Sequence, residues 1–113
     1  MPLLKLKDAE IYYEVHGRGQ PIVFLSETAC DGEVWKIHQV EAFSRDHQVI
    51  LHDYRGTGRS GKPSIDYTTK MFCDDAAALM DHLGVKQAIV IGHSMGGRIA
   101  QLLALEHPDK VDK

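Results

Sequence analysis

The stretch Gly92-His93-Ser94-Met95-Gly96 decides how this sequence is interpreted. A short apolar run at 88–91 precedes it, and a pattern typical of a helix follows over about 97–105. A strand that enters G-x-S-x-G and a helix that leaves it form the context of a nucleophile elbow, in which a serine occupies a strained turn. The pattern predicts Ser94 as a nucleophile, and the alternative is a glycine-rich turn with an ordinary serine.

The glycines around Ser94 are expected to make room for this turn. Side chains at Gly92 and Gly96 would collide with the neighbouring strand or helix, and Gly97 is expected to extend the clearance. The helix that follows directs its N-terminal amide groups and its positive dipole end towards the turn. That arrangement suits a negative charge that develops on an oxygen atom during a reaction.

The composition restricts the class of protein. The 113 residues suit one small domain, and 43% hydrophobic with 26% charged residues is ordinary for a soluble protein. The net charge is −3, and residues of opposite charge are interspersed along the sequence, so we expect neither a nucleic acid nor a membrane as partner. Cys30 and Cys73 form no CxxC and are expected to be free thiols. Without an apolar leader segment in the sequence, we expect a cytoplasmic protein.

Strands and helices alternate along the chain after an initial hairpin. Strands are predicted at 3–6, 10–16, 22–25, 48–54 and 88–91, and helices at 33–45, 68–83 and 97–105. The helix at 33–45 is expected to bury Trp35, Ile37, Val40 and Phe43, and Gly84 is expected to end the helix at 68–83. The fold class is therefore α/β, with a mostly parallel sheet, an N-terminal hairpin and helices on both faces. Ligands of such sheets bind beyond the carboxyl ends of the strands, where 26–30, 53–60 and Ser94 are expected to converge.

Three features together resemble the N-terminal half of an α/β-hydrolase. They are Gly-His-Ser-Met-Gly-Gly at 92–97, Asp-Tyr-Arg-Gly-Thr-Gly-Arg-Ser at 53–60 after a strand, and Trp35 after the loop that follows Leu25. The resemblance implies an incomplete α/β-hydrolase core over 1–113, without the lid and the C-terminal strands. It implies Ser94 as nucleophile, the Met95 N–H as one oxyanion donor and Thr28 as the other, and no cofactor. The substrate would be a small ester, lactone or similar acyl compound.

The loop after Leu25 departs from the pattern of the family. The family commonly has His-Gly where this chain has Ser26-Glu27, so a carboxylate is expected near the second oxyanion donor. The turn at 53–60 is expected to be structural, with Asp53 and Arg55 bonded to neighbouring groups.

The triad of the family continues with an acid and then a histidine, and this sequence has few candidates for them. His107 is thirteen residues beyond Ser94, about 20 Å along a helix, which is too far for a general base. His52 lies on a strand but precedes the nucleophile. We therefore expect little turnover by these residues alone. Two hypotheses stay open: the chain is a piece of a longer hydrolase, or it is a natural short chain.

The second hypothesis carries an alternative function. The strand at 88–91 would then be an open edge that pairs with a second copy or a complementing chain, and the protein would be a non-catalytic binding module.

Other chemistries are disfavoured by the sequence. Residues 56–61 spell G-x-G-x-x-G, but Pro63 prevents a helix from starting there to hold a phosphate. The seven histidines form no spaced ligand motif, so no metal site is expected. Asp74 and Asp75 are interpreted as a surface pair on a helix.

Overall fold

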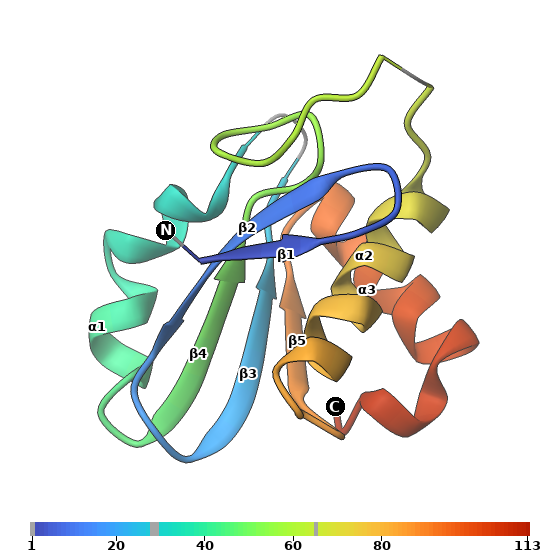
Figure 1. Cartoon of the computed structure of the whole chain (residues 1–113). Helices are drawn as coiled ribbons and strands as arrows, with labels where there is room; N and C mark the ends of the chain where they lie inside the picture. The colour runs from blue at the N-terminus through green and yellow to red at the C-terminus, as the bar shows by residue number, and fades with distance from the viewer. Residues whose placement is uncertain (1, 28–29, 65) are drawn as a thin grey trace.

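The computed structural model describes residues 2–27, 30–64 and 66–113 (Figure 1). Five strands form one sheet in the order β1-β2-β4-β3-β5. The strands are β1 Leu3–Lys5, β2 Glu10–His16, β3 Gln20–Leu25, β4 His47–His52 and β5 Ile89–Gly92. The strands β3, β4 and β5 are parallel, whereas β1 and β2 form an antiparallel hairpin that continues antiparallel onto β4. The prediction of a mostly parallel sheet with an N-terminal hairpin is confirmed.

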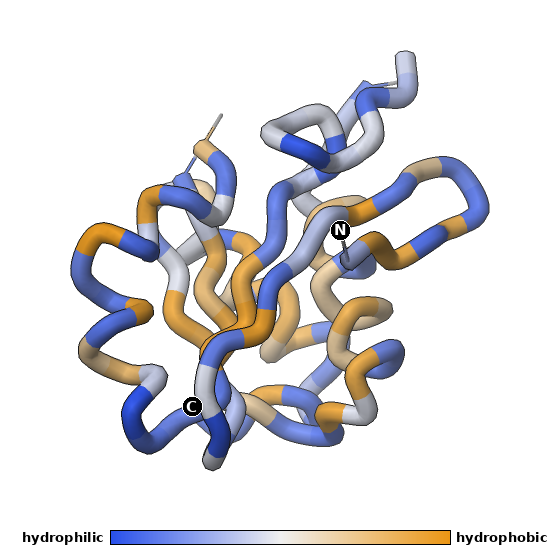
Figure 2. Tube along the Cα trace, turned by 60° about the vertical axis from the view of Figure 1, so that its left-hand side comes forward, coloured by the Kyte–Doolittle hydropathy of each residue, from blue (hydrophilic) through white to orange (hydrophobic). Residues whose placement is uncertain are grey.

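Helical segments cover both faces of this sheet (Figure 1). They are η1 Gly32–Lys36, α1 Gln39–Phe43, α2 Thr69–His82, α3 Met95–Glu106 and η2 Pro108–Lys110. Because successive strand residues point to opposite faces, β3 divides its apolar side chains between two cores. Val23 and Leu25 pack with α2 and α3, whereas Ile22 and Phe24 pack with η1 and α1. Figure 2 shows hydrophobic residues gathered on the central strands, with hydrophilic residues on the outer loops.

The single helix predicted at 33–45 is two short segments in the structure. The backbone of His38, with φ −134° and ψ −46°, separates η1 from α1. Trp35 is buried against Phe24, with ring centroids 4.8 Å apart, but Ile37 is 68% exposed. The apolar residues of this segment therefore do not form one continuous helical stripe, and the prediction that Ile37 is buried is wrong.

The helix α2 agrees with its predicted limits. The hydroxyl of Thr68 accepts a hydrogen bond from the Met71 N–H at 3.1 Å, which caps the first turn. Gly84 follows the helix with φ +71°, the left-handed conformation that ends many helices.

Asp75 of α2 is not the surface residue that the sequence suggested. It is 4% exposed, and its two carboxylate oxygens accept hydrogen bonds from Arg55 at 2.7 and 2.8 Å. Arg55 also forms an ion pair with Asp8, whose side chain is exposed, at an N–O distance of 3.0 Å. Asp74, the neighbour of Asp75, does lie on the surface. One member of the predicted surface pair therefore belongs to a buried ion pair that ties α2 to the turn after β4.

The edge of the sheet at β5 is paired over part of its length. The N–H of Ala88 donates to Lys110 O at 2.9 Å, and the N–H of Asp112 donates to Ala88 O at 2.8 Å. The N–H of Val90 donates to Lys113 O at 2.8 Å. The expectation of a wholly unpaired edge at 88–91 is therefore wrong, because 110–113 return alongside it.

In the part of the chain that the structure describes, no helix has the length and apolar character needed to cross a membrane.

Candidate active site

The turn between β5 and α3 has the backbone of a nucleophile elbow. Ser94 has φ +57° and ψ −117°, and among residues 2–27, 30–64 and 66–113 it alone of the non-glycine residues has a positive φ. Such a conformation costs about 1–3 kcal/mol and persists only where the surrounding structure holds it. The turn is fastened to the end of β3, because the N–H of His93 donates to Leu25 O at 3.1 Å. Ser94 itself is exposed at the carboxyl end of the sheet.

Two of the three glycines are required by this geometry. A Cβ atom on Gly92 would lie far inside contact distance of the carbonyl of Gly96. A Cβ atom on Gly96 would overlap the carbonyl group of Leu25 to a similar extent. A Cβ on Gly97 would meet nothing closer than Gly92 O at 3.8 Å, an ordinary contact. The predicted roles of Gly92 and Gly96 are thus supported by the geometry, whereas the described residues make no close approach to Gly97.

The start of α3 supplies a candidate oxyanion donor. Met95 is the first residue of this helix, and no acceptor for its N–H is found within the described ranges. The first N–H groups of a helix lack intrahelical partners and favour negative charge. The second donor predicted from the resemblance, at Thr28, lies outside the described residues.

The loop after β3 is anchored by Ser26, which is 2% exposed. Its hydroxyl accepts a hydrogen bond from Trp35 Nε1 at 2.9 Å and donates to Asp31 O at 3.1 Å. Its carbonyl accepts a hydrogen bond from the Tyr54 hydroxyl at 2.8 Å. The loop is therefore held at its start by side chains from two other segments.

Glu27 extends from this loop towards the elbow. Its carboxylate lies 3.5 Å from Nδ1 of His93, the residue before the nucleophile, and accepts a hydrogen bond from the Cys30 thiol at 3.3 Å. That hydrogen bond raises the pKa of Cys30. A hollow of about 300 Å³ lies here, lined by Glu27, Val34, Trp35, Gln39 and His93. Sequence reasoning placed Glu27 near the site but missed its pairing with His93, which depends on how two loops meet.

The turn at 53–60 is structural, as predicted. Asp53 is buried, and its carboxylate accepts hydrogen bonds from the N–H of Gly32 at 2.8 Å and of Arg59 at 2.9 Å. The hydroxyl of Ser60 donates to Asp53 O and accepts from the N–H of Tyr12 at 2.9 Å.

The phosphate-loop interpretation of residues 56–61 finds no support. The loop closes on itself, with the N–H of Gly56 bonded to Gly61 O at 2.8 Å, and Lys62 Nζ bonds to Gly58 O at 2.7 Å. The next helix begins only at Thr69. A phosphate site of this type needs a helix that starts at the loop.

The histidines considered as general base do not contact Ser94. His107 lies at the far end of α3, and its Nε2 is 3.4 Å from the carboxylate of Asp74. His52 is enclosed in the core beside Tyr54, and burial lowers its pKa to about 4. Within the described part of the chain, Ser94 Oγ forms no hydrogen bond to a base. The expectation that neither histidine serves as the base therefore agrees with the geometry.

Comparisons with known proteins agree with this geometry. A sequence model of the alpha/beta hydrolase fold matches residues 15–113. A protein of Azorhizobium caulinodans named "Putative carbamate hydrolase RutD" is 40% identical over 111 residues, which cover 98% of this chain and 42% of that protein. The chain thus spans about two fifths of the length of this relative.

Solved structures give the same result. The structure of Est816, described as an N-acyl homoserine lactone degrading enzyme, superposes with a TM-score of 0.92 at 38% identity, over 97% of this chain and 42% of that one. The enol-lactonase of Burkholderia xenovorans LB400 superposes with a TM-score of 0.91 at 32% identity, over 97% and 44% of the two chains. From the strained serine, the glycines that make room for it, the sheet order and these matches, it follows that this chain belongs to the α/β-hydrolase fold family.

Proposed function

We propose that this chain supplies the nucleophile and one oxyanion donor of a serine hydrolase that acts on small esters, lactones or related acyl compounds. The observation that carries the proposal is the backbone of Ser94, which is strained in the manner of an elbow and is exposed. Ser94 Oγ would attack the substrate carbonyl, and the N–H of Met95 would stabilise the oxyanion that results. One such donor contributes about 3–4 kcal/mol to the stability of the transition state.

The names of the relatives support this substrate class. One is described as degrading a lactone, one is an enol-lactonase, and one is named as a carbamate hydrolase. Each of these substrates has a carbonyl carbon bonded to an oxygen or nitrogen leaving group. A nucleophilic serine and an oxyanion hole serve all of them by the same addition step.

A general base is the part of this machinery that we do not assign to residues of the chain. Ser94 without a base is a weak nucleophile at neutral pH, since its hydroxyl stays protonated. We therefore expect the 113 residues to turn over substrate slowly or not at all, and we expect an external base to accelerate the reaction of Ser94.

Fluorophosphonate labelling with chemical rescue tests the proposal. The chain is incubated with the probe at several concentrations of imidazole, and the labelled residue is identified by mass spectrometry. We expect labelling at Ser94 that accelerates with imidazole, is absent from Ser94→Ala and is retained in the control Ser44→Ala. Circular dichroism confirms that each variant is folded. A folded chain that takes no label at Ser94 even with imidazole would contradict the proposal.

One observation favours the alternative, a binding module that associates through its sheet edge. The residues of β5 are only half-buried, and the pairing with 110–113 reaches Ala88 and Val90 but not Gly92, the last residue of β5. We propose that a second copy or a complementing chain extends the sheet there. Sizing chromatography with light scattering over a range of concentrations is expected to show a dimer. If the chain is a monomer at every concentration, the proposed association with a second copy is wrong.

A variant separates this association from general instability. Val90→Lys places a charge on the edge strand, but Val90 also packs against the core beneath α2 and α3. Loss of the dimer is therefore informative only if the circular dichroism spectrum of the variant is unchanged.

A further inference from the structure

The helices α2 and α3 bring four potential metal ligands together, far from the elbow. Cys73 and Asp74 belong to α2, Glu106 is the last residue of α3, and His107 follows it. One ligand atom from each lies within 4.8 Å of the other three. The twelve residues of α3 separate this cluster from Ser94 by about 18 Å. The sequence predicted no metal site because each helix supplies only two adjacent residues, which form no recognisable motif.

The thiol of Cys73 forms the floor of the cluster. Cys73 is completely buried, and its thiol has no hydrogen-bond partner among the residues that the structure describes. The side chains of Asp74, Glu106 and His107 are 48%, 33% and 31% exposed, so they form a rim that solvent reaches. The buried Sγ of Cys73 thus lies within 4.8 Å of an imidazole nitrogen and two carboxylate oxygens, donor types that zinc takes together.

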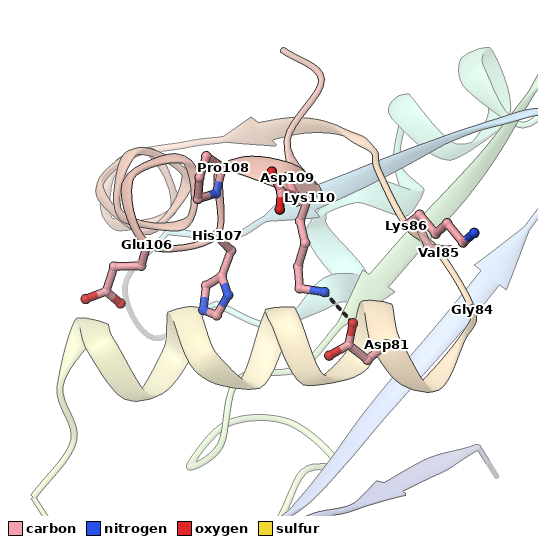
Figure 3. A pocket seen from close by; sticks show the side chains of 9 residues that line it. All are labelled: Asp81, Gly84, Val85, Lys86, Glu106, His107, Pro108, Asp109 and Lys110. Atoms are coloured by element: carbon pink, nitrogen blue, oxygen red, sulfur yellow. Dashed lines mark hydrogen bonds and ion pairs between the residues drawn. The ribbon is translucent and has the colours of Figure 1, made fainter.

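Access to the cluster is open on the side of His107. A cavity of about 450 Å³ lies between the end of α3 and α2, and Glu106 and His107 belong to its lining. Figure 3 shows the His107 ring directed from the end of α3 towards α2, while Lys110 reaches across to Asp81 farther along the helix. An ion could therefore reach the imidazole without any movement of the backbone.

A cation already lies at the carboxylates. The ammonium group of Lys70 is 2.9 Å from Glu106 and 3.1 Å from Asp74, and the side chain of Lys70 is 58% exposed. The carboxylates thus converge on one positive charge, which can move into solvent at little cost. Burial, together with the charges of Asp74 and Glu106, raises the pKa of Cys73 to about 11, so the thiol stays protonated beside this ammonium.

We propose that Cys73, Asp74, Glu106 and His107 bind Zn²⁺ and clamp the end of α3 to α2. Thiolate, imidazole and carboxylate are the donors that zinc takes in fourfold coordination, whereas Mg²⁺ and Ca²⁺ prefer oxygen alone. Bonds of about 2.0–2.3 Å to a tetrahedral ion place ligand atoms about 3.5 Å apart. The four ligand atoms, now within 4.8 Å of one another, reach these positions when side-chain rotations move them by roughly 1 Å. Binding breaks the S–H bond of Cys73, releases its proton to solvent and displaces the ammonium of Lys70. The three negative ligands then exceed the two charges of the ion by one.

Cobalt substitution tests the thiolate ligand directly. Titration of the chain with Co²⁺ is expected to give a thiolate-to-cobalt charge-transfer band in the near ultraviolet and intense visible bands typical of tetrahedral coordination. Addition of Zn²⁺ should abolish both. Cys73→Ser is expected to lose the charge-transfer band, and the matched control Cys30→Ser is expected to retain it. Absence of the band in the wild type, or its survival in Cys73→Ser, would overturn the proposal.

Two surface variants keep the test valid even if Cys73→Ser does not fold. His107→Gln is expected to weaken Zn²⁺ binding about a hundredfold in competition with a chromophoric chelator, and unchanged affinity would refute the ligand set. Lys70→Met removes the ammonium group that lies at the carboxylates and is expected to tighten binding. If Lys70→Met leaves Zn²⁺ unbound while the fold is intact, the cluster is an ion pair and not a metal site. Zn²⁺ should also raise the melting temperature of the wild type but not of His107→Gln.

Discussion

Gly96 and Gly97 are adjacent glycines of the same helical turn, and alanine should have opposite effects on the free energy of unfolding at the two positions. At Gly96 an added Cβ would lie 2.5 Å from the carbonyl carbon of Leu25 and 2.8 Å from Ser26 O, and closer still to the carbonyl oxygen of Leu25. All of these atoms are backbone, so no side chain can rotate to relieve the overlap. The start of α3 would have to move away from the end of β3 by about 1 Å.

The size of the effect follows from these contacts. Overpacking of this kind costs about 1–3 kcal/mol, and the movement also strains the hydrogen bond from His93 N–H to Leu25 O. We expect Gly96→Ala to destabilise the chain by about 3 kcal/mol. Gly97→Ala meets only Gly92 O at 3.8 Å, so the lower entropy of the unfolded chain should stabilise it by about 0.5–1 kcal/mol.

Urea denaturation followed by circular dichroism measures both changes in the same conditions. The midpoint of Gly96→Ala should fall by more than about 1 M, and that of Gly97→Ala should rise slightly. The slope of the transition should stay the same, since neither change alters the area buried on folding. Equal midpoints for the two variants would refute the assignment of the close contact to Gly96. A larger loss in Gly97→Ala than in Gly96→Ala would show that the glycine roles are reversed.

Three further predictions concern charged and titratable groups. Asp75→Asn should destabilise the chain by about 2 kcal/mol in urea denaturation, because Arg55 then keeps only the exposed Asp8 as a charged partner, whereas Asp74→Asn on the surface should change stability by less than about 0.5 kcal/mol. Burial lowers the pKa of His52 to about 4, so below pH 6.5 the unfolded chain binds a proton that the folded chain excludes. Stability should therefore fall by about 3 kcal/mol between pH 6.5 and pH 4, and a chain with His52→Leu that shows the same fall would contradict this. Glu27→Gln removes a negative charge beside the elbow and should accelerate fluorophosphonate labelling severalfold at low salt, and an unchanged rate would place Glu27 outside the field of the oxyanion.

The sequence was sufficient for features that depend on local pattern. The alternation of strands and helices, the helix at 68–83 and its stop at Gly84 all follow from residue types at fixed offsets, and the structure confirms each. G-x-S-x-G with a strand before it and a helix after it also placed the strained residue at Ser94. These features are determined within about ten residues of chain, which is the range over which periodicity and turn chemistry act.

Features that depend on contacts between distant segments were not predictable. The apolar residues at 33–45 suggested one helix, but the packing of Trp35 on Phe24 leaves Ile37 in solvent. Asp75 reads as a surface residue because its partner, Arg55, is twenty positions away in a turn. The pairing of 110–113 with β5 has no sequence signal of its own either, since so short a segment has no period.

The strain at Ser94 shows how the two kinds of information combine. β5 ends at Gly92 and α3 begins at Met95, so only two residues reverse the chain between a strand and a helix that are both fixed by packing. Ile99 of α3 is completely buried, and β5 is held by its parallel pairing with β3. Neither element can move to relax the turn, and Gly96 allows them to approach this closely. The glycines of the motif therefore permit the elbow, but the core beneath α3 is what imposes about 1–3 kcal/mol of strain on Ser94. A change that loosens that core should relax Ser94 and lower its reactivity without touching any residue of the motif.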